Sequence, residues 1–229
     1  MSRLEPFPTP DAAAEAAAAA IVAQLTPPGP KHIVVTGGRT PGHTYDQLAA
    51  TDLDWSRVTV TLSDERFVDP TAEESNERLV RQRLLQSHAA AAKFVPLKGH
   101  GATPADDARA ADPAVRALAP FDVVMLGMGD DGHIGSLFPS TPHVMELLSP
   151  TAAEAVVGID VAGVAPFVPR ISLTGRVLLD AKLILVLISG ETKRAVIERV
   201  QKDPDFAPPI SAAIRQTRAP VRVLWSPAA

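Results

Sequence analysis

Residues 121–139 read FDVVMLGMGDDGHIGSLFP, and this stretch predicts the fold of the chain. Its apolar run Val123–Leu126 is too short for a core helix and is bounded by a proline and by glycines. Such a run is typical of a strand that is buried on both faces of a parallel sheet. The glycine-rich turn behind it carries Asp130, Asp131 and His133. Because open α/β sheets bind ligands at the carboxyl ends of their strands, we expect a functional site here.

The same turn has the G-x-G-x-x-G spacing of a dinucleotide-binding fingerprint, in Gly127, Gly129 and Gly132. That fingerprint needs a helix directly behind it, whose N-terminus holds the pyrophosphate. Pro139 and Pro142 limit such a helix to little more than one turn. The two aspartates of the turn also place negative charge where the pyrophosphate would lie. We therefore reject a dinucleotide site at this turn.

The composition is that of a protein with one substantial α/β core. The chain has 229 residues, of which 46% are hydrophobic, and we expect a single domain over residues 1–229. Its net charge of −4 comes from interspersed acids and bases, which predicts neither nucleic acid nor an anionic membrane as a partner. No apolar run reaches the length of a membrane span.

The chain contains no cysteine, which excludes disulfides, thiolate nucleophiles and cysteine-based zinc sites. The first residues also lack the basic-then-apolar pattern of a signal peptide. Both features suit a cytoplasmic enzyme.

Further apolar or β-branched runs predict the remaining strands of the large sheet: His32–Val35, Arg57–Leu62, Phe94–Leu97, Leu183–Ile188 and Val221–Trp225. We expect helices near Asp11 to Leu25, from Pro41 onward, over Glu77–Gln86, from Pro104 to about Leu118, from about Glu191, and over Ile210–Arg215. Pro113 is expected to break the fourth of these helices. Val156–Asp160 and Arg170–Leu173 predict a smaller antiparallel portion. The alternation of strands and helices predicts an α/β fold with an open, mostly parallel sheet flanked by helices.

The segment TGGRT, Thr36–Thr40, follows the first of these strands and predicts an anion-binding turn. A strand, two glycines and a helix start offer backbone N–H groups and a helix dipole, and Arg39 and Thr40 add donors. Lys193 opposes the dipole in the first turn of a later helix, which also indicates a nearby anion. Two plainer alternatives remain: a turn that needs glycine only for its backbone angles, and a lysine that lies in solvent.

Charged residues also lie at the ends of two further predicted strands. Asp64, Glu65 and Arg66 follow the second strand, and Arg170 begins a strand of the smaller portion. The first group is either part of a binding site or a solvated loop with a local Glu–Arg pair. Arg170 is either a ligand or a charged residue that protects a sheet edge.

Five stretches, in this order, resemble the 6-phosphogluconolactonases: VVTGGRTPGHTYDQL, SDERFVDPTAEESNERLVRQRLL, GMGDDGHIGSLFPSTP, PRISLTGRVLLDAKLILVLISGETK and PVRVLW. The resemblance covers nearly the whole chain from Lys31 onward. It implies a Rossmann-like sheet with a smaller antiparallel portion. The same superfamily contains glucosamine-6-phosphate deaminases and ribose-5-phosphate isomerases, so the fold alone does not decide the reaction.

The resemblance also implies the residues of the site. His133 would act as general base on a water molecule, with Asp131 either orienting the imidazole or holding a sugar hydroxyl. The substrate-binding residues would be Gly37, Gly38, Arg39, Thr40, Asp64, Glu65, Arg66, Asn76, Gly132, Arg170 and Lys193. Among them, Arg66 is expected to contact the substrate directly. The family more often has a small hydroxyl residue where Arg39 stands, so Arg39 either joins the phosphate contacts or points outward.

The implied activity is hydrolysis of a phosphosugar lactone, 6-phospho-D-glucono-1,5-lactone, without a metal or a cofactor. One alternative is an amino-sugar-phosphate isomerase or deaminase that uses Asp64 as a carbon base. Those enzymes continue toward F-N-E-P after the D-G-H turn, whereas Ser136–Pro139 supplies no carboxylate. The other alternative is a non-catalytic sugar-phosphate sensor, and the chain shows no DNA-binding segment that would favour it. The sequence does not determine the oligomeric state, and a monomer is compatible with it.

Overall fold

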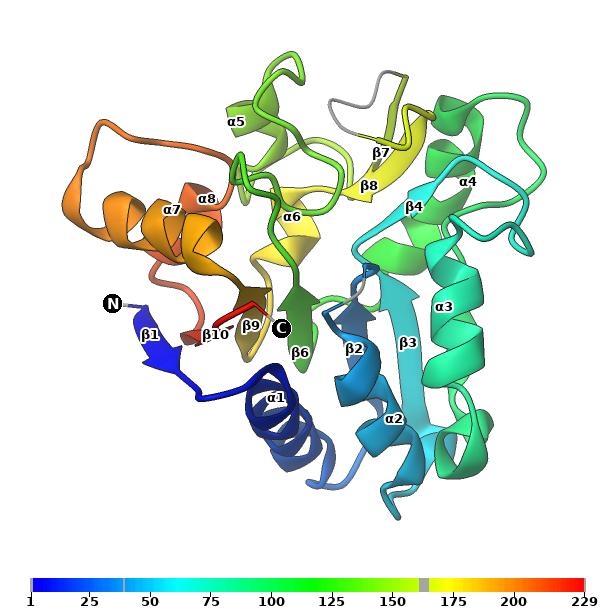
Figure 1. Cartoon of the computed structure of the whole chain (residues 1–229). Coiled ribbons are helices and arrows are strands. Elements are labelled where there is room, and N and C mark those ends of the chain that lie inside the picture. The colour runs from blue at the N-terminus through cyan, green and yellow to red at the C-terminus, as the bar shows by residue number, and fades with distance from the viewer. Residues whose placement is uncertain (1, 39, 161–164, 229) are drawn as a thin grey trace.

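The computed structural model describes residues 2–38, 40–160 and 165–228. Its centre is a seven-stranded sheet in the order β1-β10-β9-β6-β2-β3-β5, in which all paired neighbours run parallel (Figure 1). The strands are β1 (Arg3–Pro6), β2 (Lys31–Val35), β3 (Val58–Leu62), β5 (Lys93–Val95), β6 (Val123–Leu126), β9 (Ile184–Ser189) and β10 (Val221–Ser226). The predicted open parallel sheet is confirmed, with β6 at its centre.

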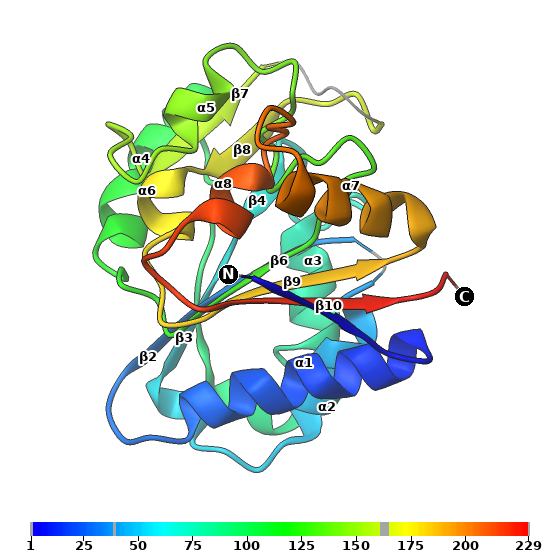
Figure 2. The same ribbon diagram turned by 90° about the vertical axis from the view of Figure 1, so that its left-hand side faces the viewer.

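Helices cover both faces of this sheet, with α1 and α2 on one face and α7 and α8 on the other (Figure 2). The described helices are α1 (Pro10–Leu25), α2 (Gly42–Ala50), α3 (Asn76–Arg83), α4 (Pro104–Arg116), α5 (Val144–Leu147), α6 (Gly175–Leu178), α7 (Glu191–Lys202) and α8 (Ser211–Arg215), with 3-10 helices at Trp55–Arg57 and Ser87–Ala91. Cover on both faces explains why β6 and β9 are continuous apolar runs. Within the described ranges, no helix combines the length and the apolar character that crossing a membrane requires.

A second sheet of three antiparallel strands has the order β4-β8-β7. Its strands are β4 (Asp64–Arg66), β7 (Val156–Ile159) and β8 (Arg170–Leu173). The last two confirm the predicted antiparallel portion. A single residue, Ser63, separates the end of β3 from the start of β4, so the small sheet starts at the carboxyl end of a strand of the large sheet.

The path of the chain through the large sheet reverses between β2 and β6. From β2 it continues to β3 on one side, and from β6 it continues to β9 on the other. In open α/β sheets a ligand-binding crevice forms outside the carboxyl ends of two such strands. The turns behind β2 and β6 are the two for which the sequence predicts anion binding and catalysis.

Three local predictions differ from the structure. The sequence does not predict β1, whose segment ends in proline; β1 lies at the edge of the large sheet, where it pairs with β10. α1 begins at Pro10, one residue before the predicted start, and its N-cap is Thr9, whose hydroxyl accepts the Ala12 N–H at 3.1 Å. The expected break at Pro113 is wrong, because α4 continues through it. Proline removes one hydrogen bond there, and packing against β7 and β8 holds the helix.

Asp122 lies at the amino-terminal edge of the large sheet, away from the crevice, and connects the starts of three strands. Its buried carboxylate accepts hydrogen bonds from the His32 N–H at 2.8 Å, from Lys182 Nζ at 2.8 Å and from Lys31 Nζ at 3.3 Å. Burial raises the pKa of Asp122, but the bonds from Lys182 and His32 and the two lysine charges outweigh it. The pKa therefore lies below its ordinary value.

We expect Asp122→Asn to lower the free energy of unfolding by roughly 1–3 kcal/mol at pH 7, because Lys31 then lies buried beside a neutral amide. A carboxyl with a depressed folded pKa stabilises the fold above the unfolded pKa of about 3.9, and that contribution is lost as pH falls through the folded pKa. The difference between wild type and variant should thus shrink below about pH 4. Urea titrations near pH 7 and near pH 3 measure it, with the exposed Asp52→Asn as control. Equal differences at both pH values would contradict this assignment.

Candidate active site

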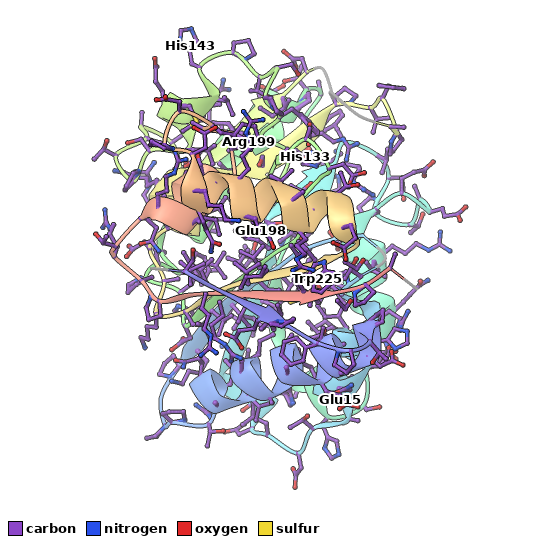
Figure 3. All side chains as sticks on the ribbon, turned by 60° about the vertical axis from the view of Figure 1, so that its left-hand side comes forward. Glu15, His133, His143, Glu198, Arg199 and Trp225 are labelled. Atoms are coloured by element: carbon purple, nitrogen blue, oxygen red, sulfur yellow. The ribbon has the colours of Figure 1, made fainter. Side chains whose placement is uncertain are left out.

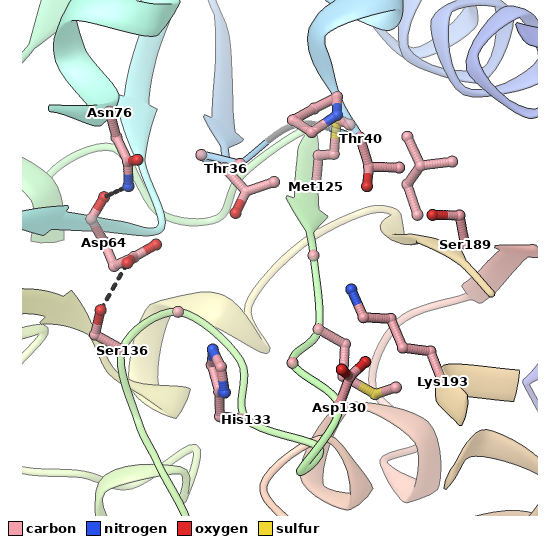
Figure 4. A pocket seen from close by; sticks show the side chains of 18 of the residues that line it. Thr36, Thr40, Asp64, Asn76, Met125, Asp130, His133, Ser136, Ser189 and Lys193 are labelled. Carbon is pink, nitrogen blue, oxygen red and sulfur yellow. Dashed lines mark hydrogen bonds between the residues drawn. The ribbon is translucent and has the colours of Figure 1, made fainter. Parts of the chain in front are cut away.

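A cavity of about 710 Å³ opens at the carboxyl ends of β2, β6 and β9 (Figure 4). Its lining includes most of the residues that the sequence predicts for the site: Gly37, Gly38, Thr40, Asp64, Arg66, Asn76, His133, Arg170 and Lys193. Glu65, Asp131 and Gly132 do not line it. Arg39 lies outside the described residues. In the part of the chain that the structure describes, no group of three His, Asp or Glu side chains could hold a metal ion.

One end of the cavity is formed by the starts of two helices. α2 begins behind Pro41 and α7 behind Gly190, and among the described residues no side chain caps the first N–H groups of either helix. Thr40 precedes α2, Lys193 lies in the first turn of α7, and both line the cavity. Uncapped helix starts and an ammonium group favour an anion. Figure 4 shows Thr40, Ser189 and Lys193 at this end.

The turn behind β2 needs glycine because another side chain lies directly against it. A Cβ atom at Gly37 would overlap the amide of Asn76. Asn76 is buried and its Nδ2 donates to the carbonyl oxygen of Asp64 at 2.8 Å, so it connects this turn to β4. Tyr45 of α2 fixes the turn as well, since its hydroxyl donates to the Thr36 carbonyl oxygen and accepts the Thr36 N–H. Burial raises the pKa of Tyr45, and the hydroxyl keeps its proton.

His133 and Asp131 form a hydrogen-bonded pair on the turn behind β6. His133 Nδ1 lies 2.6 Å from Asp131 Oδ1, which also accepts the His133 backbone N–H at 3.1 Å. Because the carboxylate accepts the Nδ1 proton, the lone pair of the neutral imidazole is on Nε2. The ring lines the cavity, and its centroid lies 4.7 Å from that of Phe138. His143, by contrast, lies at the outer edge of the molecule (Figure 3).

Gly129 lies against this pair, and we expect Gly129→Ala to displace it. A Cβ atom there would overlap the imidazole of His133 and lie 2.6 Å from Asp131 Oδ1. Such overpacking costs roughly 1–3 kcal/mol of unfolding free energy, and a displaced imidazole should lower kcat about tenfold. Gly127→Ala is the matched control, because the atoms nearest to its Cβ are those of Thr36 at 3.8 Å. Wild-type stability and turnover of Gly129→Ala would contradict this geometry.

Glu65 contacts the backbone of α3 and not the cavity. Its carboxylate accepts the N–H groups of Arg66, Asn76 and Glu77, each at 2.7 Å, and the hydroxyl of Ser75 at 3.0 Å. Burial raises the pKa of Glu65, although these donors oppose the shift. Side chains alternate along a strand, so Asp64 and Arg66 of β4 reach the cavity while Glu65 reaches the opposite side. Where the sequence predicts a substrate ligand, the structure therefore has a side chain that holds Asn76 in place.

Arg66 and Arg170 lie opposite each other across β4 and β8, and both line the cavity. Arg170 is 3% exposed and donates to two carbonyl oxygens of the loop before it. Burial and the charge of Arg66 lower the pKa of Arg170. The carboxylates of Asp64 and Glu65 oppose this shift but do not outweigh it. Arg66 Nε is buried and has no hydrogen-bond partner among the described residues. Two neighbouring guanidinium groups, one buried and one partly buried, favour an anionic ligand between or beside them.

The lining also includes polar residues that the sequence does not single out as ligands: Thr36, Asp130, Ser136 and Ser189. Thr36 directly follows β2 and Ser189 ends β9, and this position at a strand end is the signal that identifies both. Ser136 has no such signal. It lies in a tight turn that a bridge between Ile134 and Leu137 closes, a geometry that residue types alone do not predict.

Comparison with known proteins gives a consistent set of relatives. The family model of glucosamine-6-phosphate isomerases/6-phosphogluconolactonase matches residues 8–225. A 6-phosphogluconolactonase of Caulobacter vibrioides is 41% identical over 228 residues, which cover 98% of this chain and 97% of the relative. The crystal structure of a 6-phosphogluconolactonase from Shewanella baltica has a TM-score of 0.90 and 36% identity, over 99% of this chain and 98% of the other. A monomeric glucosamine-6-phosphate deaminase shares the fold alone, with a TM-score of 0.78 at 20% identity over 99% and 97% of the two chains.

Proposed function

The chain belongs to the family of glucosamine-6-phosphate isomerases and 6-phosphogluconolactonases, and on this premise we propose that it hydrolyses 6-phospho-D-glucono-1,5-lactone to 6-phospho-D-gluconate. The observation that carries the proposal is the His133–Asp131 pair, which offers an imidazole lone pair to a cavity whose other end favours a phosphate. Relatives with more than 30% identity over nearly the whole chain are named 6-phosphogluconolactonases, which supports the lactone as substrate. We place the reaction in the oxidative pentose phosphate pathway of the cytoplasm.

His133 acts as the general base in this proposal. Its Nε2 atom takes a proton from a water molecule while the water oxygen attacks the carbonyl carbon of the lactone. Asp131 accepts the Nδ1 proton in a hydrogen bond, orients the ring and stabilises the imidazolium that forms. When the tetrahedral intermediate collapses, the bond between C1 and the ring oxygen breaks, and that oxygen takes the proton back from the His133 imidazolium to become the C5 hydroxyl. The protein forms no covalent intermediate.

The phosphate group binds at the starts of α2 and α7. Its ligands are Gly37, Gly38, Thr40 and Lys193, and Arg170 adds positive charge. Arg66 and Asp64 contact the sugar from the side of the small sheet. Gly132 adopts a φ of +83°, which allows the tight turn that presents the catalytic pair.

An assay with freshly prepared lactone tests the proposal. The product is oxidised by 6-phosphogluconate dehydrogenase and followed as NADPH, and spontaneous hydrolysis is subtracted. We expect a kcat/KM above about 10⁴ M⁻¹s⁻¹ and no release of ammonia from glucosamine 6-phosphate. Lactone opening at the spontaneous rate, or deamination of the amino sugar, would overturn the proposal.

Arg66→Lys should lower kcat/KM about tenfold, because the point charge of lysine does not replace a planar guanidinium that contacts the substrate with two N–H groups. The same assay measures the effect, with Arg109→Lys at an exposed site as control. A wild-type kcat/KM in the Arg66 variant would mean that Arg66 does not contact the substrate. Its role would then be to hold the loop, where its Nη1 donates to the carbonyl oxygen of Glu74.

A further inference from the structure

Asp64 is a buried carboxylate whose hydrogen bonds come from hydroxyl groups. It is 6% exposed and lines the cavity. Ser63 Oγ donates to its Oδ1 at 2.9 Å, and Ser136 Oγ donates to its Oδ2 at 2.6 Å. An ionised carboxylate has about four acceptor sites, so two hydroxyls leave acceptor capacity for a ligand.

The hydroxyl groups around Asp64 form one hydrogen-bonded network. Ser63 Oγ also donates to Thr36 Oγ1 at 3.1 Å, so its single proton is shared between Thr36 and Asp64. Asp64 and Thr36 both line the cavity, and each has lone pairs that can accept the proton of a ligand hydroxyl. We call these two side chains the acceptor wall.

Ser136 is itself fixed by two other elements. It is 1% exposed, and its backbone N–H donates to the hydroxyl of Ser172 on β8 at 3.1 Å. The bridge between Ile134 and Leu137 closes the turn that carries it. Figure 4 shows the Ser136 hydroxyl directed at Asp64, on the side of the cavity away from Lys193. A hydroxyl held in this way determines where the Asp64 carboxylate points.

We infer that Ser136 is a positioning residue, which acts through Asp64 to select ligands that carry free sugar hydroxyls. Lys193 and the two helix starts supply donors at one end of the cavity, and the acceptor wall lies on the other side. The carboxylate of Asp130 and the guanidinium groups of Arg66 and Arg170 also line the cavity. A phosphorylated polyol fits with its phosphate at the helix starts and its hydroxyl protons at the acceptor wall. The choice of ligand rests on the proposed function, but the inference does not depend on catalysis.

Calorimetric titration of the full chain with 6-phosphogluconate and with inorganic phosphate tests the inference. Ser136→Ala should weaken binding of 6-phosphogluconate about tenfold and leave binding of inorganic phosphate unchanged. Asp64→Ala should weaken the binding of 6-phosphogluconate at least as much as Ser136→Ala does. Because Ser136 acts through Asp64, the double variant should bind no more weakly than Asp64→Ala alone. Ser63→Ala removes the other hydroxyl and supplies the same test if Ser136→Ala does not fold.

The inference would be overturned if the losses of affinity for 6-phosphogluconate added up in the double variant. It would also be overturned if Ser136→Ala weakened inorganic phosphate as much as 6-phosphogluconate, or if both serine variants bound 6-phosphogluconate with wild-type affinity. A wild type that binds phosphate but not 6-phosphogluconate would overturn it as well. These outcomes are distinct from a failure of the proposed function. If the wild type does not open the lactone but the losses in the variants are non-additive as expected, the lactonase proposal is refuted and the acceptor wall is retained. Lactone hydrolysis together with additive losses would refute the acceptor wall alone.

Discussion

His133→Asn is expected to lower kcat by about 10²- to 10⁴-fold while KM changes little. Asparagine is close to histidine in size and can still donate to the carboxylate of Asp131. It cannot take a proton from water at neutral pH, so the general base is lost while the shape of the cavity persists. A loss confined to kcat marks a group that acts in the transition state. Steady-state kinetics with the lactone measure it.

The matched control is His143→Asn, since that side chain is 75% exposed and lies away from the cavity. Spontaneous opening of the lactone increases with pH and is subtracted in every assay. If the His133 variant retains most of its activity after this correction, His133 is not the base. The remaining candidates would then be Asp131, which contacts the imidazole, and Asp64, which lines the cavity.

Lys193→Ala should raise KM about 10- to 100-fold with a small change in kcat, because it removes a charge-assisted hydrogen bond to the phosphate. The phosphate is remote from the lactone carbonyl and is held similarly in the ground state and the transition state. Losing the Lys193 contact therefore weakens the binding of the ground state and of the transition state equally, and such a change appears in KM. The uncapped start of α7 remains in the variant and retains part of the affinity.

Lys202→Ala at the other end of the same helix is the control, with a side chain that is 78% exposed. An unchanged KM with a collapsed kcat in Lys193→Ala would mean that the ammonium group acts at the reacting carbon and not on the phosphate.

The central strands of the large sheet could be predicted because their residue types leave few alternatives. β6 and β9 are short, continuous apolar runs, and such runs become central strands when helices cover both faces. β1 and β4 could not be predicted, since a segment ending in proline and a run of three charged residues have the composition of loops. Their partners β10 and β8 make them strands, and that pairing is tertiary information.

The glycine-rich turns of the site were also predictable, but not the reason for each glycine. Gly37 and Gly129 have no side chain because Asn76 and His133 occupy the space in which a Cβ atom would lie. The sequence shows the glycines without the side chains that approach them. Only a folded chain brings these partners together.

Resemblance to a family predicted the charged residues near the site, but not the direction in which each points. Glu65 illustrates the limit, because the two-residue period of β4 directs its carboxylate to α3 while its neighbours reach the cavity. The acceptor wall was not predicted for a similar reason. Serine and threonine are too common to stand out, and their roles depend on hydrogen bonds between four separate segments.

In the proposed mechanism the phosphate and the reacting carbon bind at two different places in one cavity, and a crystal structure with 6-phosphogluconate locates both groups. We expect the phosphate at the starts of α2 and α7, within hydrogen-bond distance of Lys193 Nζ and Thr40. We expect the C1 carboxylate within hydrogen-bond distance of His133 Nε2. The reverse orientation, with C1 at Lys193 and the phosphate beside His133, would contradict the mechanism.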